Sequence, residues 1–140
     1  MTIKSRANEI LRDFALFNSW EEKYEFLIEL GDDLEKMPKK MKSKQTLISG
    51  CQSKVWLFCE KINNKLYFHG DSDALITRGI VALIVRLYSG AEANEVVNYK
   101  NDVFEKIKLS SHLSMTRANG LALMIKQIEK YGKKHALEDE

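Results

Sequence analysis

The spacing of apolar residues predicts helices at both ends of the chain. From Ile3 to about Phe17, apolar side chains recur every three or four residues, which is typical of an amphipathic helix. Ser19 is expected to begin a second helix, because a serine followed three residues later by a glutamate has the form of a capping box. Ser114 is expected to cap a last long helix, and the charged tail 133–140 is expected to be frayed.

Two apolar runs in the middle of the chain predict a β-hairpin. Val55 to Lys61 is expected to form a buried strand and Lys65 to Gly70 a second one, with Asn63 and Asn64 as the connecting turn. Alternation in the second run is imperfect, so we expect one face of the hairpin to pack against helices and the other to be partly covered. Thr46 to Ile48 is a candidate for a further short strand.

The most apolar segment of the chain predicts a central helix. It runs from about Ala74 to Tyr88, and apolar residues surround nearly its whole circumference, as expected for a helix in the middle of a small domain. Asp71, Ser72 and Asp73 precede it and are expected to supply N-cap oxygens and negative charge to its first turn. A short helix is expected from Glu92 to Asn98.

Length and charge balance narrow the class of protein. A chain of 140 residues fits one domain, 1–140, that is large enough to form a hydrophobic core. Its 22 basic and 20 acidic side chains leave a net charge of +2, which is no surplus for nucleic-acid binding. No apolar stretch approaches the length needed to span a bilayer, and the N-terminus has no continuous apolar core of a signal peptide. We therefore expect a soluble protein with no nucleic-acid or membrane partner.

The two cysteines indicate a reducing compartment. Cys51 and Cys59 fall within one short segment, and a disulfide between them would require the predicted strand to fold back on itself. Both are therefore expected to be reduced thiols, which indicates a cytoplasmic protein. Cys51, Cys59 and His69 contain no close ligand pair of the C-x-x-C type, so a metal site is not expected.

Cys51 is the residue at which we expect the chemistry. It follows Gly50 on a turn before the buried strand, where a thiol can meet a partner and a residue without a Cβ lets another chain approach the sulfur. Nothing in the sequence places His69, His112 or His135 as a base beside it, so the thiol fits an acceptor better than an autonomous catalyst. The alternative is that Cys51 is a small buried hydrophobe, as free cysteines often are.

A lysine-rich segment lies just before this cysteine. Residues Lys36 to Lys44 carry five lysines around Pro38, which indicates a loop in contact with solvent. The ordinary interpretation is a charged surface that keeps the protein in solution. The alternative is a docking patch for an acidic partner surface, with which the position upstream of Cys51 is compatible.

The residues around Cys51 resemble the signature of the SufE family of sulfur acceptors. The motif is Gly50-Cys51-Gln52-Ser53-Lys54-Val55-Trp56. Further segments, spread over most of the chain, resemble other parts of the family pattern. They are Trp20-Glu21-Glu22-Lys23-Tyr24, Ile28-Glu29-Leu30-Gly31, Gly70-Asp71-Ser72-Asp73-Ala74 with Gly79, Phe104-Glu105-Lys106, Leu109, His112-Leu113-Ser114, Arg117 and Gly120-Leu121.

The resemblance implies an α+β fold in which a small antiparallel sheet packs against helices in two layers, as in SufE and in NifU-like or IscU-like scaffolds. It implies a relay in which Cys51 takes persulfide sulfur from a cysteine desulfurase (SufS/CsdA-like) and stimulates that enzyme. The sulfur would then pass to an iron-sulfur scaffold complex (SufBCD-like). Pyridoxal phosphate belongs to the desulfurase, and this chain needs no cofactor or metal. The chain itself would be a persulfide carrier, monomeric or homodimeric, rather than an enzyme.

The resemblance also implies supporting residues near the reactive cysteine. Gly50, Gln52 and Ser53 shape the loop, where the two side chains can offer hydrogen bonds. Arg117 can favour negative charge on sulfur or contact the desulfurase, although loop capping and ordinary surface charge are equal alternatives for these side chains. Asp73 is expected beside the cysteine loop, where it would take part in docking.

Two other functions stay open: an iron-sulfur cluster scaffold and a free-standing cysteine-dependent thiol enzyme.

Overall fold

The computed structural model describes residues 2–138, which form an α+β fold with a three-stranded antiparallel sheet in the order β1-β2-β3. This fold class confirms the expectation from the family resemblance. The elements along the chain are α1 (Ile3–Ala15), α2 (Trp20–Asp32), the 3-10 turn η1 (Lys39–Met41), β1 (Val55–Ile62), β2 (Lys65–Ser72), α3 (Leu75–Tyr88), β3 (Ala91–Glu92), α4 (Ala93–Asn98), α5 (Val103–Lys106), α6 (Leu109–His112) and α7 (Met115–Glu138).

The β1–β2 hairpin forms as the sequence predicts. Asn63 and Asn64 have φ angles of 52° and 67°, the left-handed values that a tight two-residue turn requires. The register pairs Leu57 with Gly70 and Cys59 with Phe68, and these residues are buried. The opposite face, which includes Trp56 and Phe58 of β1, is only partly buried. One face of the hairpin therefore packs against the helices, as expected.

Two short pieces of sheet differ from the sequence prediction. The two-residue strand β3 pairs with the start of β2. The sequence does not predict it, because two residues are too few to show an alternating pattern. The candidate strand Thr46 to Ile48 forms an isolated bridge between Leu47 and Trp56 instead of a regular strand. The Ile48 N–H still donates to the Val55 carbonyl at 2.8 Å, so this segment is fastened to the edge of β1.

The central helix α3 contacts β2, α1, α2 and α7. Its crossing with α2 is very close at Gly79, where an added Cβ would lie 2.2 Å from the Leu27 carbonyl oxygen. A side chain of any kind at that position would push the two helices apart, so the glycine sets the distance between them. The apolar character of α3 leads to burial as predicted, except at Leu75, whose side chain is exposed at the first turn.

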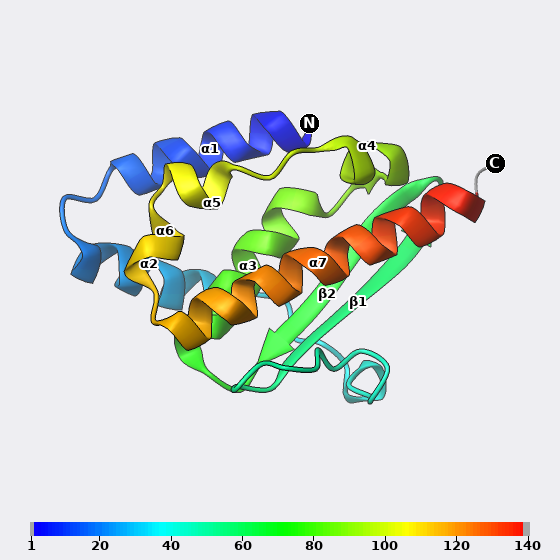
Figure 1. The fold of residues 1–140 in the computed structure, drawn as a ribbon, viewed down its shortest axis with the longest axis horizontal. Helices are drawn as coiled ribbons and strands as arrows, with labels where there is room; N and C mark the ends of the chain where they lie inside the picture. The colour runs from blue at the N-terminus through cyan, green and yellow to red at the C-terminus, as the bar shows by residue number, and fades with distance from the viewer. Residues whose placement is uncertain (1, 139–140) are drawn as a thin grey trace.

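Helix α7 runs alongside the hairpin (Figure 1), and the Tyr131 hydroxyl donates a hydrogen bond to the Leu57 carbonyl at 2.9 Å. Ser114 caps this helix as predicted, because its hydroxyl accepts from the Arg117 N–H at 3.2 Å. The predicted frayed tail is wrong for 133–138: α7 continues to Glu138, and both Gly132 and His135 are buried. Residues 139–140 of that tail lie outside the described part of the chain.

The predicted cap of α3 is also wrong. The N-cap residue is Ala74, and no side chain caps the helix. β2 continues to Ser72, so the three polar residues that the sequence assigned to a cap belong to the end of a strand and a connection. Their side chains bond elsewhere: Ser72 Oγ accepts from the Ala74 N–H, and Asp71 pairs with Lys42 and Arg78.

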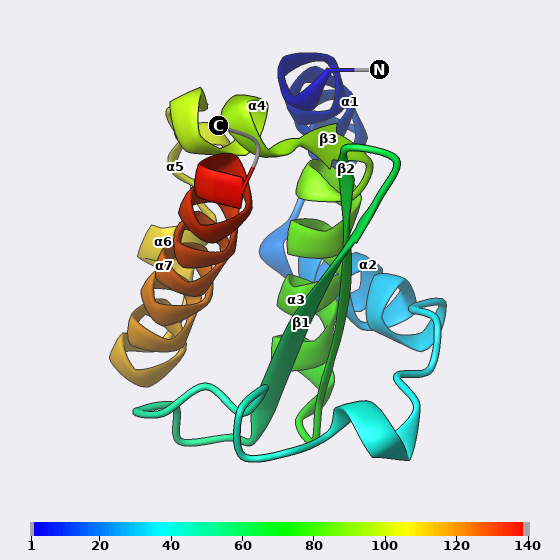
Figure 2. The same cartoon turned by 90° about the vertical axis from the view of Figure 1, so that its right-hand side faces the viewer.

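The segment between η1 and β1 extends along the lower edge of the molecule toward the start of α7 (Figure 2). This placement brings the cysteine loop, the first turns of α3 and the N-terminal half of α7 to one end of the fold. Within residues 2–138, no helix is long and apolar enough to cross a membrane.

Candidate functional site

Cys51 lies on a loop that is held against α7. The preceding Gly50 has a φ of +92°, a left-handed conformation that residues with a Cβ rarely adopt. A Cβ at Gly50 would also lie 3.1 Å from Leu123 Cδ1, so the backbone passes close to the helix. The Cys51 side chain is half-buried, and this burial raises the pKa of its thiol.

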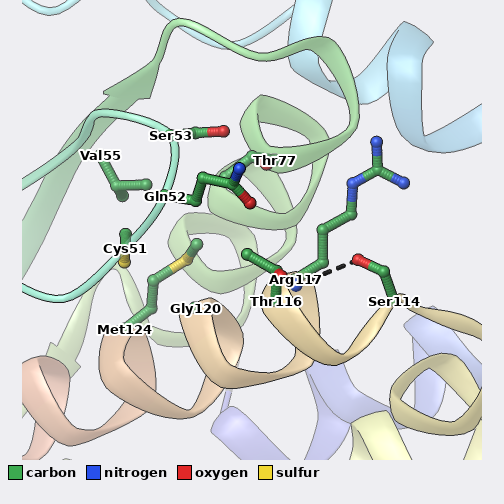
Figure 3. A pocket seen from close by; sticks show the side chains of 10 residues that line it. All are labelled: Cys51, Gln52, Ser53, Val55, Thr77, Ser114, Thr116, Arg117, Gly120 and Met124. Carbon is green, nitrogen blue, oxygen red and sulfur yellow. Dashed lines mark hydrogen bonds between the residues drawn. The ribbon is translucent and has the colours of Figure 1, made fainter.

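A cavity of about 270 Å³ opens beside Cys51 (Figure 3). It is formed by the cysteine loop, the start of β1, the first turn of α3, and α7 together with its capping residue. The lining residues are Cys51, Gln52, Ser53, Val55, Thr77, Ser114, Thr116, Arg117, Gly120 and Met124.

The sulfur of Cys51 faces an apolar part of this cavity. Figure 3 shows the thiol pointing toward α7 at Gly120 and Met124. An added Cβ at Gly120 would lie 3.7 Å from Sγ, so the absence of a side chain there leaves the space beside the sulfur open. Val55 and Met124 are almost fully buried. Apolar surroundings disfavour the thiolate, which accounts for the direction of the pKa shift.

The opposite side of the cavity carries polar side chains. Gln52, Ser53 and Arg117, three of the residues that the sequence singled out, all line it. The Arg117 guanidinium points away from the Cys51 sulfur (Figure 3), and within residues 2–138 it forms no ion pair. Arg117 therefore stands at the cavity without contacting the thiol in this conformation.

Asp73 lies beside the cysteine loop, where the resemblance placed it. Its carboxylate accepts a hydrogen bond from the Lys54 N–H at 3.0 Å, and its own N–H donates to the Lys54 carbonyl at 3.3 Å. Lys54 closely follows Cys51, so these two bonds join the end of the loop to the connection that leads into α3. Asp73 thus anchors the loop and does not cap the helix.

The remaining thiol and the histidines lie elsewhere. Cys59 is buried on β1, and this burial raises its pKa to about 12. His112 stacks on Trp20 with ring centroids 3.9 Å apart, and His135 lies 2.9 Å from a Glu138 oxygen. No histidine is among the described residues that line the Cys51 cavity. Within residues 2–138, no group of three or more histidine, cysteine, aspartate or glutamate side chains is arranged to hold a metal ion.

Sequence reasoning does not assign Thr77, Thr116 or Met124 to the site. Thr77 comes from the first turn of α3, and nothing in the linear sequence indicates that this turn meets the cysteine loop. Gly120 and Met124 are four residues apart on α7, so they lie on one face of that helix. Met124 is buried, and its place beside the sulfur depends on how α7 packs against the cysteine loop.

The chain belongs to the SufE family. The family model, described as an Fe-S metabolism associated domain, matches residues 8–132. A SufE-like protein of Rhizobium meliloti (strain 1021) is 40% identical over an alignment of 127 positions that covers 87% of this chain and 91% of the relative. A SufE-like protein of Rhizobium etli is 37% identical over an alignment of 134 positions that covers 92% of this chain and 90% of the relative. Both relatives are named as uncharacterised.

The fold is shared with a solved structure of low sequence identity. The solution structure of a hypothetical protein from Thermus thermophilus matches with a TM-score of 0.79 and 13% identity, covering 94% of this chain and 96% of the other. At this identity the likeness concerns the fold alone. The family match associates the chain with iron-sulfur metabolism.

Proposed function

We propose that this protein is a sulfur acceptor that carries persulfide sulfur on Cys51 between a cysteine desulfurase and an iron-sulfur scaffold. The observation that carries the proposal is the placement of Cys51: a half-buried thiol on a loop, beside a cavity, in a member of an iron-sulfur-associated family. No histidine lines that cavity among the described residues, so the thiol depends on a partner for its activation.

The transfer is an exchange at sulfur without net oxidation. The Cys51 thiolate attacks the outer sulfur of the persulfide on the desulfurase, a new S–S bond forms at Cys51, and the old S–S bond breaks. The desulfurase cysteine leaves as a thiolate and takes up a proton, so Cys51 now bears the persulfide. A second exchange of the same kind passes the outer sulfur to the scaffold.

The environment of Cys51 suits a carrier that rests between encounters. Its raised pKa keeps the free thiol neutral, which slows reaction with stray electrophiles. The apolar space beside Gly120 and Met124 can shelter the added sulfur from reductants and oxidants. Docking of a partner would move the loop outward and expose the thiolate for exchange, which would also stimulate the desulfurase.

The proposed partners follow from this chemistry. The donor is a cysteine desulfurase of the SufS or CsdA type, whose pyridoxal phosphate forms the first persulfide, and the recipient is a SufBCD-like scaffold. In this role the protein is a carrier and activator in the cytoplasm, where thiols stay reduced, and it has no cofactor of its own. A cluster scaffold would need several ligands together, and the described residues offer no such group.

The proposal is tested by mass analysis of the protein after incubation with a cysteine desulfurase, its pyridoxal phosphate and free cysteine. We expect one added sulfur that peptide mapping places on Cys51. Cys51→Ser should abolish the addition, whereas Cys59→Ala, which removes the buried thiol, should retain it. Sulfur mapped to Cys59, or a Cys51→Ser variant that still loads, would overturn the assignment.

A further inference from the structure

A second cavity is lined in part by the segment that leads to Cys51. It has a volume of about 490 Å³ and opens between the lysine-rich segment, β1 and the C-terminal half of α7. Its apolar surface comes from Met41, Phe58 and the ring of Tyr131, all half-buried. We name this cavity the lysine groove; its full lining is Lys40, Met41, Ser43, Gln45, Thr46, Phe58, Gln127, Tyr131 and Lys134.

The walls of the lysine groove are held by hydrogen bonds. The buried Thr46 hydroxyl donates to the Met41 carbonyl at 2.6 Å and accepts from the Ser43 N–H at 3.0 Å, which closes the lysine-rich segment into a defined turn. The Leu57 N–H donates to the Thr46 carbonyl at 2.9 Å, so the turn is joined to β1. The groove therefore exists before any ligand binds, which lowers the entropic cost of binding.

The charge on the groove has one sign. Lys40 and Lys134 lie on opposite walls, both are exposed, and no acidic side chain is among the described residues that line the groove. Neither lysine forms an ion pair within residues 2–138. Lys42 differs, because it pairs with Asp71 at 2.6 Å and lies over the Trp56 ring. In a chain with a net charge of only +2, two lysines that form no ion pair among the described residues thus stand above an apolar floor.

We propose that the lysine groove binds an acidic segment of the protein that exchanges sulfur with Cys51, with an apolar side chain of that segment seated on Phe58 and Met41. Carboxylates on either side of the apolar residue would then face Lys40 and Lys134. Charge complementarity of this kind selects a partner and speeds encounter more than it adds affinity. The identity of the partner rests on the proposed function, whereas the binding itself does not.

The position of the groove explains why this partner would be the one that exchanges sulfur. Thr46 lines the groove, and the chain continues from it through Ile48 to Gly50 and Cys51. The opposite wall, α7, contacts Gly50 through Leu123 and continues to the Cys51 cavity at Gly120. A chain bound in the groove therefore contacts the two elements that hold the cysteine loop in place.

The test is a titration of isotope-labelled protein with the peptide Glu-Glu-Leu-Glu-Glu, followed by amide chemical shifts. We expect shifts confined to the segment from Met41 to Thr46, to Phe58 and its neighbours, and to α7 around Tyr131. The matched peptide Gln-Gln-Leu-Gln-Gln should give none at the same concentration. No shifts, shifts scattered over unrelated lysines, or equal shifts from the glutamine peptide would overturn the proposal, as would equal shifts from a short single-stranded DNA.

Substitutions that change the charge of the lysine groove should change its affinity for the acidic peptide in a direction set by their sign. Gln127→Glu should weaken binding of the acidic peptide about threefold and Gln127→Lys should strengthen it by a similar factor, because each changes one charge in the groove. Lys40→Glu with Lys134→Glu should weaken it about tenfold. Lys4→Glu with Lys100→Glu changes the net charge equally at exposed positions outside the groove and should have little effect. Equal losses of peptide affinity in the two double variants would overturn a specific site. Melting curves of all four variants confirm that they are folded.

The proposal and the proposed function can fail separately. Peptide binding involves no sulfur transfer, so it stands or falls whether or not Cys51 loads. If Cys51 loads and the peptide does not bind, the lysine groove is ordinary surface and the carrier function is unaffected. If the peptide binds and Cys51 does not load, the groove serves a partner of another kind.

Discussion

At the scale of single residues, the proposed function sets Cys51 two opposed requirements. A sulfur carrier has to react with its partner, which favours a thiolate, and it has to stay inert between encounters, which favours a neutral and sheltered thiol. The structure meets the second requirement through burial beside Gly120 and Met124. In the proposed function, reactivity would depend on leaving this position, so the loop conformation would decide when the thiol is available.

The first prediction concerns the pH at which Cys51 becomes reactive. Because burial raises the pKa of the thiol, the thiolate fraction at neutral pH is lower than in a free cysteine. The rate of alkylation by iodoacetamide, measured from about pH 6 to 11 in a Cys59→Ala background, should therefore reach half its maximum above the ordinary value of about 8.5. Unfolding in guanidinium should return the midpoint to that value. A folded midpoint at or below it would contradict a sheltered resting state.

At the scale of elements, the start of α3 is the place where the local sequence is most misleading. Asp71, Ser72 and Asp73 are all good N-cap residues, and the strand that ends among them cannot be distinguished from a turn by composition. In the structure the first two belong to β2, and the Asp73 carboxylate accepts a hydrogen bond from the Lys54 N–H. These partners are far apart in the sequence, so only the tertiary fold could reveal the role.

The second prediction tests Asp73 as the anchor of the cysteine loop. Asp73→Ala removes the acceptor of the Lys54 N–H, and losing one such hydrogen bond costs about 1 kcal/mol. If that energy holds the loop closed, alkylation of Cys51 should become about fivefold faster. Asp73→Asn keeps an acceptor oxygen without the charge and should resemble the wild type.

The two Asp73 variants separate three outcomes. Faster alkylation in the alanine variant alone supports the anchor. Equal effects in both variants would mean that the charge of the carboxylate matters and the hydrogen bond does not. A lower melting temperature with unchanged alkylation would leave Asp73 as a contributor to stability alone. Desulfurase affinity, measured on the folded asparagine variant, shows whether the charge also takes part in docking.

The elements that the sequence predicts well are those whose residue pattern lies within the element itself. The hairpin follows from two apolar runs around Asn63 and Asn64, and the central helix from its continuous apolar surface. The end of α7 is missed because Lys133 and Lys134 make the segment look solvated, although the residues on either side of them, Gly132 and His135, are buried. Gly132 packs closely against Val96 of α4, a contact across the fold that no local pattern contains.

The candidate site, too, has a part that the local sequence predicts and a part that it does not. Cys51 and its loop could be recognised, because a cysteine beside a glycine at the start of a buried strand is a local pattern and the family motif surrounds it. The cavity could not be recognised from the sequence, because it is formed where this loop, Thr77 and α7 meet in the folded chain. Arg117 lies at the site as expected, but the direction of its side chain follows from packing.

At the scale of the whole molecule, Asp71 joins three parts of the fold. It stands near the end of β2, and its carboxylate pairs with Lys42 of the lysine-rich segment at 2.6 Å and with Arg78 of α3 at 2.9 Å. Burial opposes ionisation of this carboxyl. The hydrogen bonds from Lys42 and the Ser72 N–H, together with the charge of Arg78, outweigh burial and lower its pKa. The segment before Cys51 is thus tied to the core by an ion pair.

The last prediction is that the contribution of Asp71 to stability disappears in acid. Because its pKa is lower in the folded than in the unfolded chain, the charged form is stabilised by folding. That stabilisation is fully present above the unfolded value of about 4 and is lost as the pH falls through the folded value. The difference in unfolding free energy between the wild type and Asp71→Asn, measured by urea denaturation, should be constant from about pH 5 to 7 and should shrink below about pH 4. Lys42→Met should reduce the difference, since it removes one partner of the carboxylate. A difference that stayed constant or grew in acid would show that Asp71 contributes through packing and not through its charge.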